Sequence, residues 1–209
     1  MKLVKEKYFQ AIDKAFNNAE ELIEDAEILA KHNKKARAYT LFQLSIEEIG
    51  KAFLTFQFVL NGNIEDAEET KRFFKDFRNH TVKTKTSQGI DFMFALQIEK
   101  SRYSKKMIEE FIFQRDDVII SNDYKNYSLY TSYKDGEFCT PSEIITKDML
   151  DKISKHAKFR LQVGKPFIKL GIDNYDILFK TRDLLNEEEA SIETQKKIEE
   201  LLNSKFDSK

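Results

Sequence analysis

The sequence predicts an all-α protein, a helical bundle into which a β-hairpin is inserted late in the chain. Helix breakers are rare, because the 209 residues include only 6 Gly and 2 Pro, and the composition otherwise favours helices. Apolar residues recur at three- and four-residue steps over long segments, which is the periodicity of amphipathic helices. Only the stretch around Asp135-Gly136 alternates aromatic and polar residues, and this pattern indicates a hairpin.

Four helices are expected in the first 115 residues. The second helix should end at Asn61-Gly62, which is a common stop signal. Asn63 can then cap a third helix that begins at Ile64. The expected ranges are 4–31, 35–60, 64 to His80 or Lys83, and about 88–115.

The remainder of the chain is expected to hold the hairpin and two further helices. Pro141 should close the hairpin, and Thr146 can cap a fifth helix up to Val163, where Gly164 and Pro166 interrupt it. We expect one domain over residues 1–209, with core helices within 4–115, the hairpin within 122–140 and C-terminal helices within 146–202, the last from 175 to 202.

Charge and composition exclude several classes of protein. The 35 basic and 36 acidic residues exclude a generally basic nucleic-acid coat, although they allow a local basic patch. The single cysteine, Cys139, excludes an intramolecular disulfide, and no ligand spacing predicts a metal site or a cofactor. The N-terminus does not have the pattern of a signal peptide, and no apolar run reaches the ~18 residues of a membrane span. We therefore expect a cytoplasmic protein with no membrane partner.

The second helix carries polar residues in an unusual setting. It is apolar on two sides, so it should be central to the bundle or lie between the bundle and a partner, yet Glu47, Glu48, Gly50 and Lys51 interrupt it. The spacing of Glu47 and Lys51 predicts an ion pair, and Gly50 permits the close approach of another helix. The pair can be purely structural. Because a partly buried pair adds little stability, we favour a pair that holds another group in place.

The third helix is expected to carry charged residues along one face, beside Phe73 and Phe77. Histidine exchanges protons near neutral pH, and arginine or lysine can bind phosphate. An ordinary solvated face is the alternative, and Arg78 points elsewhere on the helix. The residues on the charged face are Arg72, Asp76, His80 and Lys83.

Two motifs together resemble a known family. The E-E-x-G-K motif of residues 47–51 and the H-x-x-K motif at His80 and Lys83 resemble the AbiV-type abortive-infection proteins of bacteria, which belong to the HEPN superfamily of helical bundles. The later stretch YSLYTSYKDGEFCTPSEIITKDML is also similar to that family, so the resemblance spans roughly residues 10–165. It implies a HEPN-like bundle and a role in phage defence, in which the infected cell is halted before the phage multiplies.

The resemblance also implies metal-independent ribonuclease activity in a homodimer whose site spans the two-fold axis. Such proteins use an arginine followed four to six residues later by a histidine. Here one residue separates Arg78 from His80, whereas seven separate Arg72 from His80, which places their α-carbons about 12 Å apart on a helix. A composite site from both protomers and a loss of catalysis both remain open.

RNA cleavage by attack of a ribose 2′-OH would suit these residues, because it needs proton transfer and cations around the phosphate. We expect His80 to move the proton, with Arg72 or Arg78 beside the phosphate. Candidate RNA-binding residues are Lys51, Lys83 and Lys85; candidate supporting residues are Glu47, Glu48, Gly50 and Asp76.

A second hypothesis is a non-catalytic protein that binds a phage-encoded activator or the ribosome and its associated factors. Tyrosines of the hairpin would anchor such an interface, although half of them are expected to pack on the bundle instead. A third hypothesis is a helical scaffold whose charges matter only for folding. The phenylalanine-rich third helix and the two-sided second helix predict a homodimer. The interface candidates are Phe73, Phe77, Tyr127 and Tyr130.

Overall fold

The structure, a computed structural model, describes residues 2–87 and 123–185 and confirms the predicted fold class. The described part is helical except for one two-stranded sheet. The helix expected over 88–115 and the end of the last helix, beyond residue 185, lie outside the described residues.

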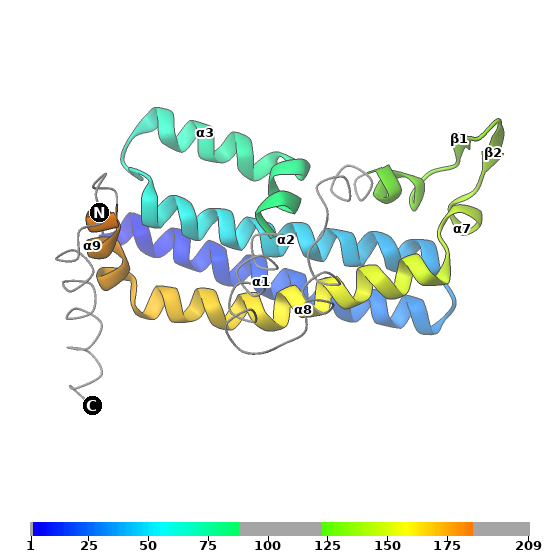
Figure 1. The fold of residues 1–209 in the computed structure, drawn as a ribbon, viewed down its shortest axis with the longest axis horizontal. Helices are drawn as coiled ribbons and strands as arrows, with labels where there is room; N and C mark the ends of the chain where they lie inside the picture. Colours follow the sequence, from blue (N-terminus) through cyan, green and yellow to red (C-terminus); the bar gives the residue numbers. More distant parts are fainter. Residues whose placement is uncertain (1, 88–122, 186–209) are drawn as a thin grey trace.

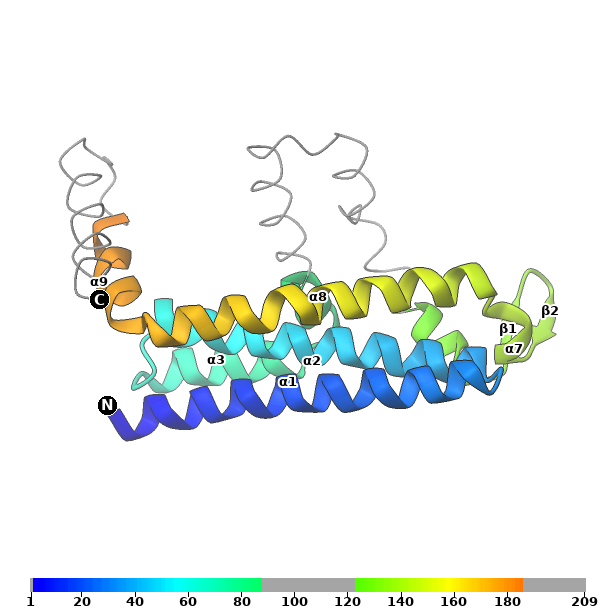
Figure 2. The same cartoon turned by 90° about the horizontal axis from the view of Figure 1, so that it is seen from below.

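Three long helices run side by side along the molecule (Figure 1). They are α1 (Lys2–Lys31), α2 (Lys35–Asn61) and α8 (Lys147–Asp173), and Figure 2 shows the same arrangement from below. The first two form an antiparallel pair, joined by a short turn in which Asn33 has a positive φ of 59°. The predicted first and second helices are confirmed, including the end of α2 at Asn61-Gly62.

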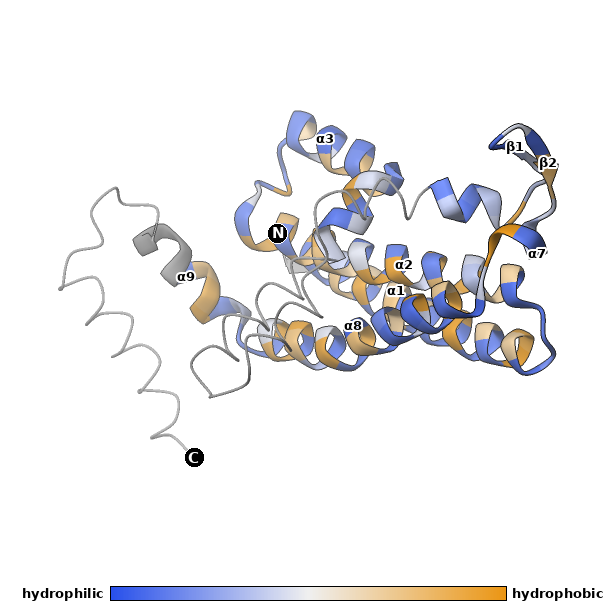
Figure 3. Ribbon diagram, turned by 45° about the vertical axis from the view of Figure 1, so that its right-hand side comes forward, coloured by the Kyte–Doolittle hydropathy of each residue, from blue (hydrophilic) through white to orange (hydrophobic). Residues whose placement is uncertain are grey.

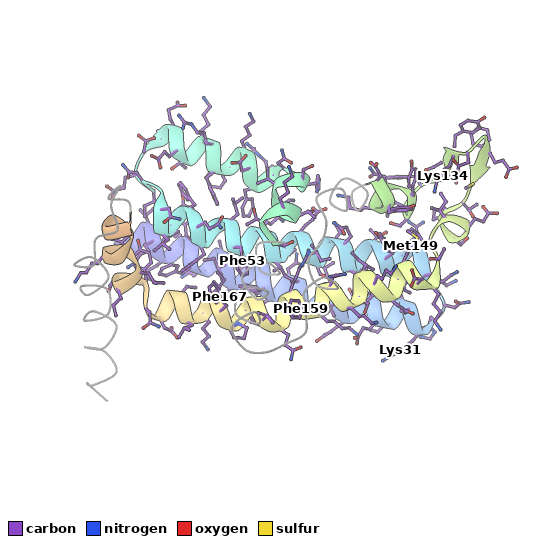
Figure 4. All side chains as sticks on the ribbon, viewed as in Figure 1. Lys31, Phe53, Lys134, Met149, Phe159 and Phe167 are labelled. Atoms are coloured by element: carbon purple, nitrogen blue, oxygen red, sulfur yellow. The ribbon has the colours of Figure 1, made fainter. Side chains whose placement is uncertain are left out.

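The core is built around α2, whose apolar residues cluster with those of α1 and α8. Figure 3 shows apolar stretches along all three helices. One cluster, around Phe42 and Ile46, lies near the α1–α2 turn. The other, around Ile49 and Phe53, lies along the opposite half of the helix. Phe53 also stacks on Phe167 of α8, with ring centroids 6.3 Å apart (Figure 4). The two-sided apolar pattern of α2 therefore marks a central helix.

The predicted interruption of α8 is wrong. The helix begins after Thr146, which caps it as expected by accepting a hydrogen bond from the Met149 amide at 3.2 Å. It then continues through Gly164 and Pro166 to Asp173. Pro166 lies on the exposed side, where water can bond to the carbonyl that loses its helical partner, while Gly164 is buried. Packing on the bundle outweighs the local cost of both residues.

Helix α3 (Ala67–Arg78) begins later and ends earlier than the sequence predicted. Its cap is Asp66, whose side chain accepts from the Glu69 amide at 2.8 Å, so the expected capping by Asn63 is wrong. It stops at Asn79, which is extended (φ −83°, ψ 115°). The Asn79 side chain accepts from the Thr81 amide at 3.0 Å and so caps a new helical segment over 80–87. The expected continuous helix through Lys83 is therefore wrong.

The hairpin is real but shorter than expected. Strands β1 (Ser132–Lys134) and β2 (Glu137–Cys139) pair antiparallel. Asp135 and Gly136 occupy the two-residue turn with φ of 53° and 91°, as the Asp-Gly signal predicted. Residues 123–127, which we expected in the hairpin, are instead helical. The helices that follow are α7 (Pro141–Ile144), ahead of α8, and α9 (Tyr175–Leu185).

Gly50 lets the 80–87 segment cross α2 in close contact, as predicted. A Cβ added at Gly50 would overlap the Lys83 carbonyl oxygen and lie 2.7 Å from its carbon. We expect Gly50→Ala to lower the free energy of unfolding by about 1–3 kcal/mol in urea denaturation, because the backbones must move apart. Gln57→Ala on the exposed side of α2 is the control and should change it by less than about 0.5 kcal/mol. Equal effects of the two substitutions would contradict this account.

Candidate functional site

Glu47 of α2 is the buried centre of a group of ionisable side chains. Its own side chain is only 3% exposed, and the Nδ1 atom of His80 lies 2.5 Å from its Oε2 atom. The Lys83 Nζ lies 3.2 Å from the same oxygen. The Lys125 Nζ lies 2.7 Å from the other oxygen, Oε1. These four residues, here called the Glu47 cluster, come from α2 and from the 80–87 and 123–127 segments.

Local sequence features place the two shorter segments on α2. The break at Asn79 starts a new helix, and the i, i+3 spacing puts His80 and Lys83 on one side of it. Gly50 allows that side to lie directly against α2. The 123–127 segment is held by Ser128, whose hydroxyl bonds to the Thr40 hydroxyl of α2 at 2.7 Å. Glu47 is thereby enclosed from two directions.

The cluster keeps Glu47 ionised. Burial alone would raise the pKa of Glu47, but hydrogen bonds from Lys125 and His80 and the positive charges of Lys125 and Lys83 lower that pKa below its ordinary value. One carboxylate faces two lysine side chains, both almost fully buried. The site therefore carries surplus positive charge, which suits a negatively charged ligand.

Glu47 also fixes the orientation of the His80 ring. A carboxylate can only accept a hydrogen bond, so the short contact requires the proton on Nδ1. In the neutral ring Nε2 then carries the free lone pair, and no hydrogen-bond partner for Nε2 occurs among the described residues. The His80 side chain is 56% exposed although its partner is buried. Such an imidazole can accept a proton from a group that docks against its outer edge.

The lowered pKa of Glu47 predicts a specific loss of stability in acid. A carboxyl whose pKa is lower in the folded than in the unfolded protein stabilises the fold above its unfolded pKa, and that stabilisation is lost as pH falls through the folded value. Unfolding free energies measured from about pH 6 to about pH 3 should therefore fall more steeply for the parent protein than for Glu47→Gln. Parallel curves would show that Glu47 does not titrate in this way.

Lys51 does not pair with Glu47, so that prediction is wrong. Its ammonium instead lies 2.5 Å from Glu48 Oε1, one turn back on the same helix. It also lies 5.4 Å from the centroid of the Phe77 ring. The Glu47 carboxylate is occupied by the lysines of other segments, which approach it from outside α2.

The expected charged face of a single third helix is not formed. Because the helix is interrupted at Asn79, Arg72 and Asp76 belong to α3, while His80 and Lys83 belong to the next helical segment. Arg72 is exposed, and the Arg78 Nε donates to the Phe74 carbonyl of its own helix at 3.0 Å. Lys85 is also exposed. Within the described residues, four of the candidate side chains make no ion pair or hydrogen bond to the Glu47 cluster. These four are Arg72, Asp76, Arg78 and Lys85.

The aromatic interface candidates are divided between interior and surface. Phe73 is buried and stacks on Phe58 with centroids 4.5 Å apart, so it is a packing residue within the chain rather than a surface contact. Phe77 is half-buried beside it. As expected for half of the hairpin tyrosines, two pack on the core and two are exposed. The packed ones are Tyr124 and Tyr127; the exposed ones are Tyr130 and Tyr133.

Sequence reasoning missed Lys125 and a second buried ionic position on α8. Lys125 belongs to no motif and lies where a strand was expected, so nothing in the surrounding sequence indicated this role. Arg160 is 1% exposed and donates to the Ser87 hydroxyl at 3.0 Å. Burial and the charges of Arg160 and Lys155 lower the pKa of His156 to about 3, so this histidine is neutral at physiological pH.

Comparison with known proteins agrees with the motifs. The family model of AbiV, a HEPN-type family, matches residues 7–162, which include all four members of the Glu47 cluster. Searches of curated proteins and of solved structures gave no significant match. Among the described helices, none combines the length and apolar content needed to cross a membrane. The match covers most of the chain, which therefore belongs to the AbiV family of HEPN-type abortive-infection proteins.

Proposed function

We propose that this protein defends a bacterium against phage as a metal-independent endoribonuclease that halts the infected cell. The observation that carries the proposal is the Glu47–His80 contact. It joins a buried carboxylate to a half-exposed imidazole at 2.5 Å and leaves Nε2 as a free base. A base held in a fixed tautomer, beside surplus positive charge, is what cleavage of RNA without a metal requires.

In the proposed reaction, the 2′-OH of a ribose gives its proton to His80 Nε2. Its oxygen then bonds to the adjacent phosphorus, and the bond from phosphorus to the 5′ oxygen of the next nucleotide breaks. That leaving oxygen takes up a proton from water or from a second acid. The products are a 2′,3′-cyclic phosphate and a 5′-OH. Glu47 stabilises the imidazolium formed, and the lysine charges favour the phosphorane.

Exposed cations near the cluster in sequence would hold the RNA backbone. Lys83 is buried against Glu47, so its contribution to phosphate binding would be through its field rather than through direct contact. Arg78 and Lys85 are exposed on either side of His80 along the chain and are our candidates for direct contact. We assign weaker supporting roles to Arg72, Asp76 and the Glu48–Lys51 pair.

We further propose that the protein acts as a homodimer in the cytoplasm. Large apolar side chains remain exposed on two helices, with Phe74 of α3 at 46% and Leu170 of α8 at 63%. Light scattering after size exclusion should give twice the chain mass of 24.6 kDa. A monomer that cleaves RNA at full rate would exclude a site shared between protomers.

The test of the nuclease is direct. Purified protein is mixed with total RNA, with and without EDTA, and the fragment ends are analysed. We expect fragments with 2′,3′-cyclic phosphates in both reactions. Intact RNA in both reactions would overturn the proposal if the same protein, produced in cells, protects those cells from phage.

A second candidate function is favoured by the exposed hairpin. Tyr133 and Phe138 form a cross-strand aromatic pair, 64% and 81% exposed, with centroids 5.1 Å apart. Tyr130 is 65% exposed beside them in the chain. Such rings are suitable anchors for a phage-encoded protein or for a ribosome-associated target. Loss of phage protection on Tyr133→Ser and Phe138→Ser, with no RNA cleavage by the parent, would favour this binding function over the nuclease.

A further inference from the structure

Lys125 is the member of the Glu47 cluster that contacts both halves of the acid–base pair. Its Nζ lies 2.7 Å from Glu47 Oε1 and 3.2 Å from His80 Nδ1. Within the part of the chain that the structure describes, Lys83 in contrast reaches the carboxylate but not the ring. The Lys125 side chain is 8% exposed, so its charge lies in a poorly solvated environment next to the ring.

The two neighbours of His80 Nδ1 would require opposite hydrogen-bonding roles of it. Glu47 can only accept a hydrogen bond, whereas an ammonium group can only donate one. The contact with Glu47 is the shorter one, 2.5 Å against 3.2 Å, so Nδ1 carries a proton and donates its hydrogen bond to Glu47. Lys125 then acts on the ring through its charge and acts on the carboxylate through a hydrogen bond. Glu47 stabilises a protonated ring, and Lys125 opposes that effect.

The backbone around Lys125 is fixed by bonds that do not involve the ring. The Ser128 hydroxyl donates to the Lys125 carbonyl at 2.6 Å and also bonds to the Thr40 hydroxyl at 2.7 Å. Arg37 of α2 donates to the Leu129 carbonyl at 3.2 Å. The lysine is therefore held at a constant position relative to α2, as a positioning group must be.

We propose that Lys125 is a positioning residue: it anchors Glu47 Oε1 and places a fixed positive charge beside His80 Nδ1, which favours the neutral form of the ring, with Nε2 available as a base. Its importance for catalysis rests on the proposed nuclease function, but its effect on the ring does not. The charged groups around the Glu47–His80 contact come from three segments: Glu47 from α2, Lys83 from the 80–87 segment and Lys125 from the 123–127 segment. Other charged side chains within four residues of these positions in the chain are Glu48, Lys51, Asp76, Arg78, Lys85 and Asp123.

The ring can be observed directly, because the chain has only 3 histidines. ¹⁵N signals of the ring nitrogens, assigned by single substitutions, report both the tautomer and the midpoint of titration. In Lys125→Met we expect the His80 midpoint to rise by on the order of one pH unit, because a nearby positive charge has been removed. Lys125→Arg retains the charge and should titrate like the parent. Lys165→Met, which breaks a Lys–Glu pair between α8 and α1, is the matched control.

Kinetics provide the second readout. For Lys125→Met we expect kcat to fall about tenfold on the acidic side of the pH profile and to recover at higher pH, with KM little changed. A merely structural lysine would not move the profile along the pH axis. Lys125→Gln serves as a second neutral variant if the methionine variant fails to fold.

The outcomes separate the two proposals. An unchanged His80 titration in the folded neutral variants would overturn the role of Lys125, whether or not RNA is cleaved. Absence of cleavage by the parent protein would overturn the nuclease instead, while the ring titration would still decide whether Lys125 controls the protonation of His80.

Discussion

Glu47→Gln is expected to lower the free energy of unfolding by about 3–5 kcal/mol, the largest stability effect that we expect from a single substitution in the cluster. The amide leaves Lys83 and Lys125, 5% and 8% exposed, without an opposing charge. Removing one member of a buried ionic group costs much more than the group contributes, since the remaining charges cannot return to water. Denaturant unfolding at neutral pH measures the change.

Glu20→Gln is the matched control for this prediction. Glu20 also joins two helices through a lysine, Lys165, at 2.7 Å, but both side chains are about 40% exposed, at 42% and 38%. We expect a loss of less than about 1 kcal/mol, because water screens the pair and solvates the lysine when the carboxylate is removed. If the two variants lost the same stability, burial would not explain why removing the Glu47 carboxylate costs more than removing an exposed one.

His80→Ala is expected to reduce RNA cleavage by about 10²- to 10⁴-fold, which is the usual contribution of a general base. Folding should be affected much less than in Glu47→Gln, because the His80 side chain is 56% exposed. Initial rates on a defined RNA measure the first effect, and the plating efficiency of phage on cells that produce the variant measures its consequence. We expect protection to be lost together with cleavage.

His32→Ala is the control for this substitution. His32 is exposed in the turn between α1 and α2, so the variant should cleave RNA and protect cells as the parent does. Full cleavage by His80→Ala would remove the histidine from the mechanism. Loss of protection in His80→Ala without any cleavage by the parent would instead assign His80 to a binding surface.

The features that the sequence predicted well depend on local physical chemistry. Periodicity located α1 and α2, because one apolar face must recur every three or four residues in any helix that packs. Thr146 was recognisable as a cap, and Asp135-Gly136 as a turn that requires positive φ. The motif residues Glu47, Gly50, His80 and Lys83 were also identified from the sequence, and the structure places them together.

Tertiary structure decided which of the charged residues meet. Within α2 the spacing favoured a Glu47–Lys51 pair, but Glu47 contacts Lys125, 78 residues away in sequence. Arg72 was expected on the same helix face as His80, but the interruption at Asn79 separates them into different helices. Helix periodicity and capping act over a few residues, so they can be read directly from the chain. The partner of a buried charge depends on which distant segments the core brings together, and only the folded arrangement determines that.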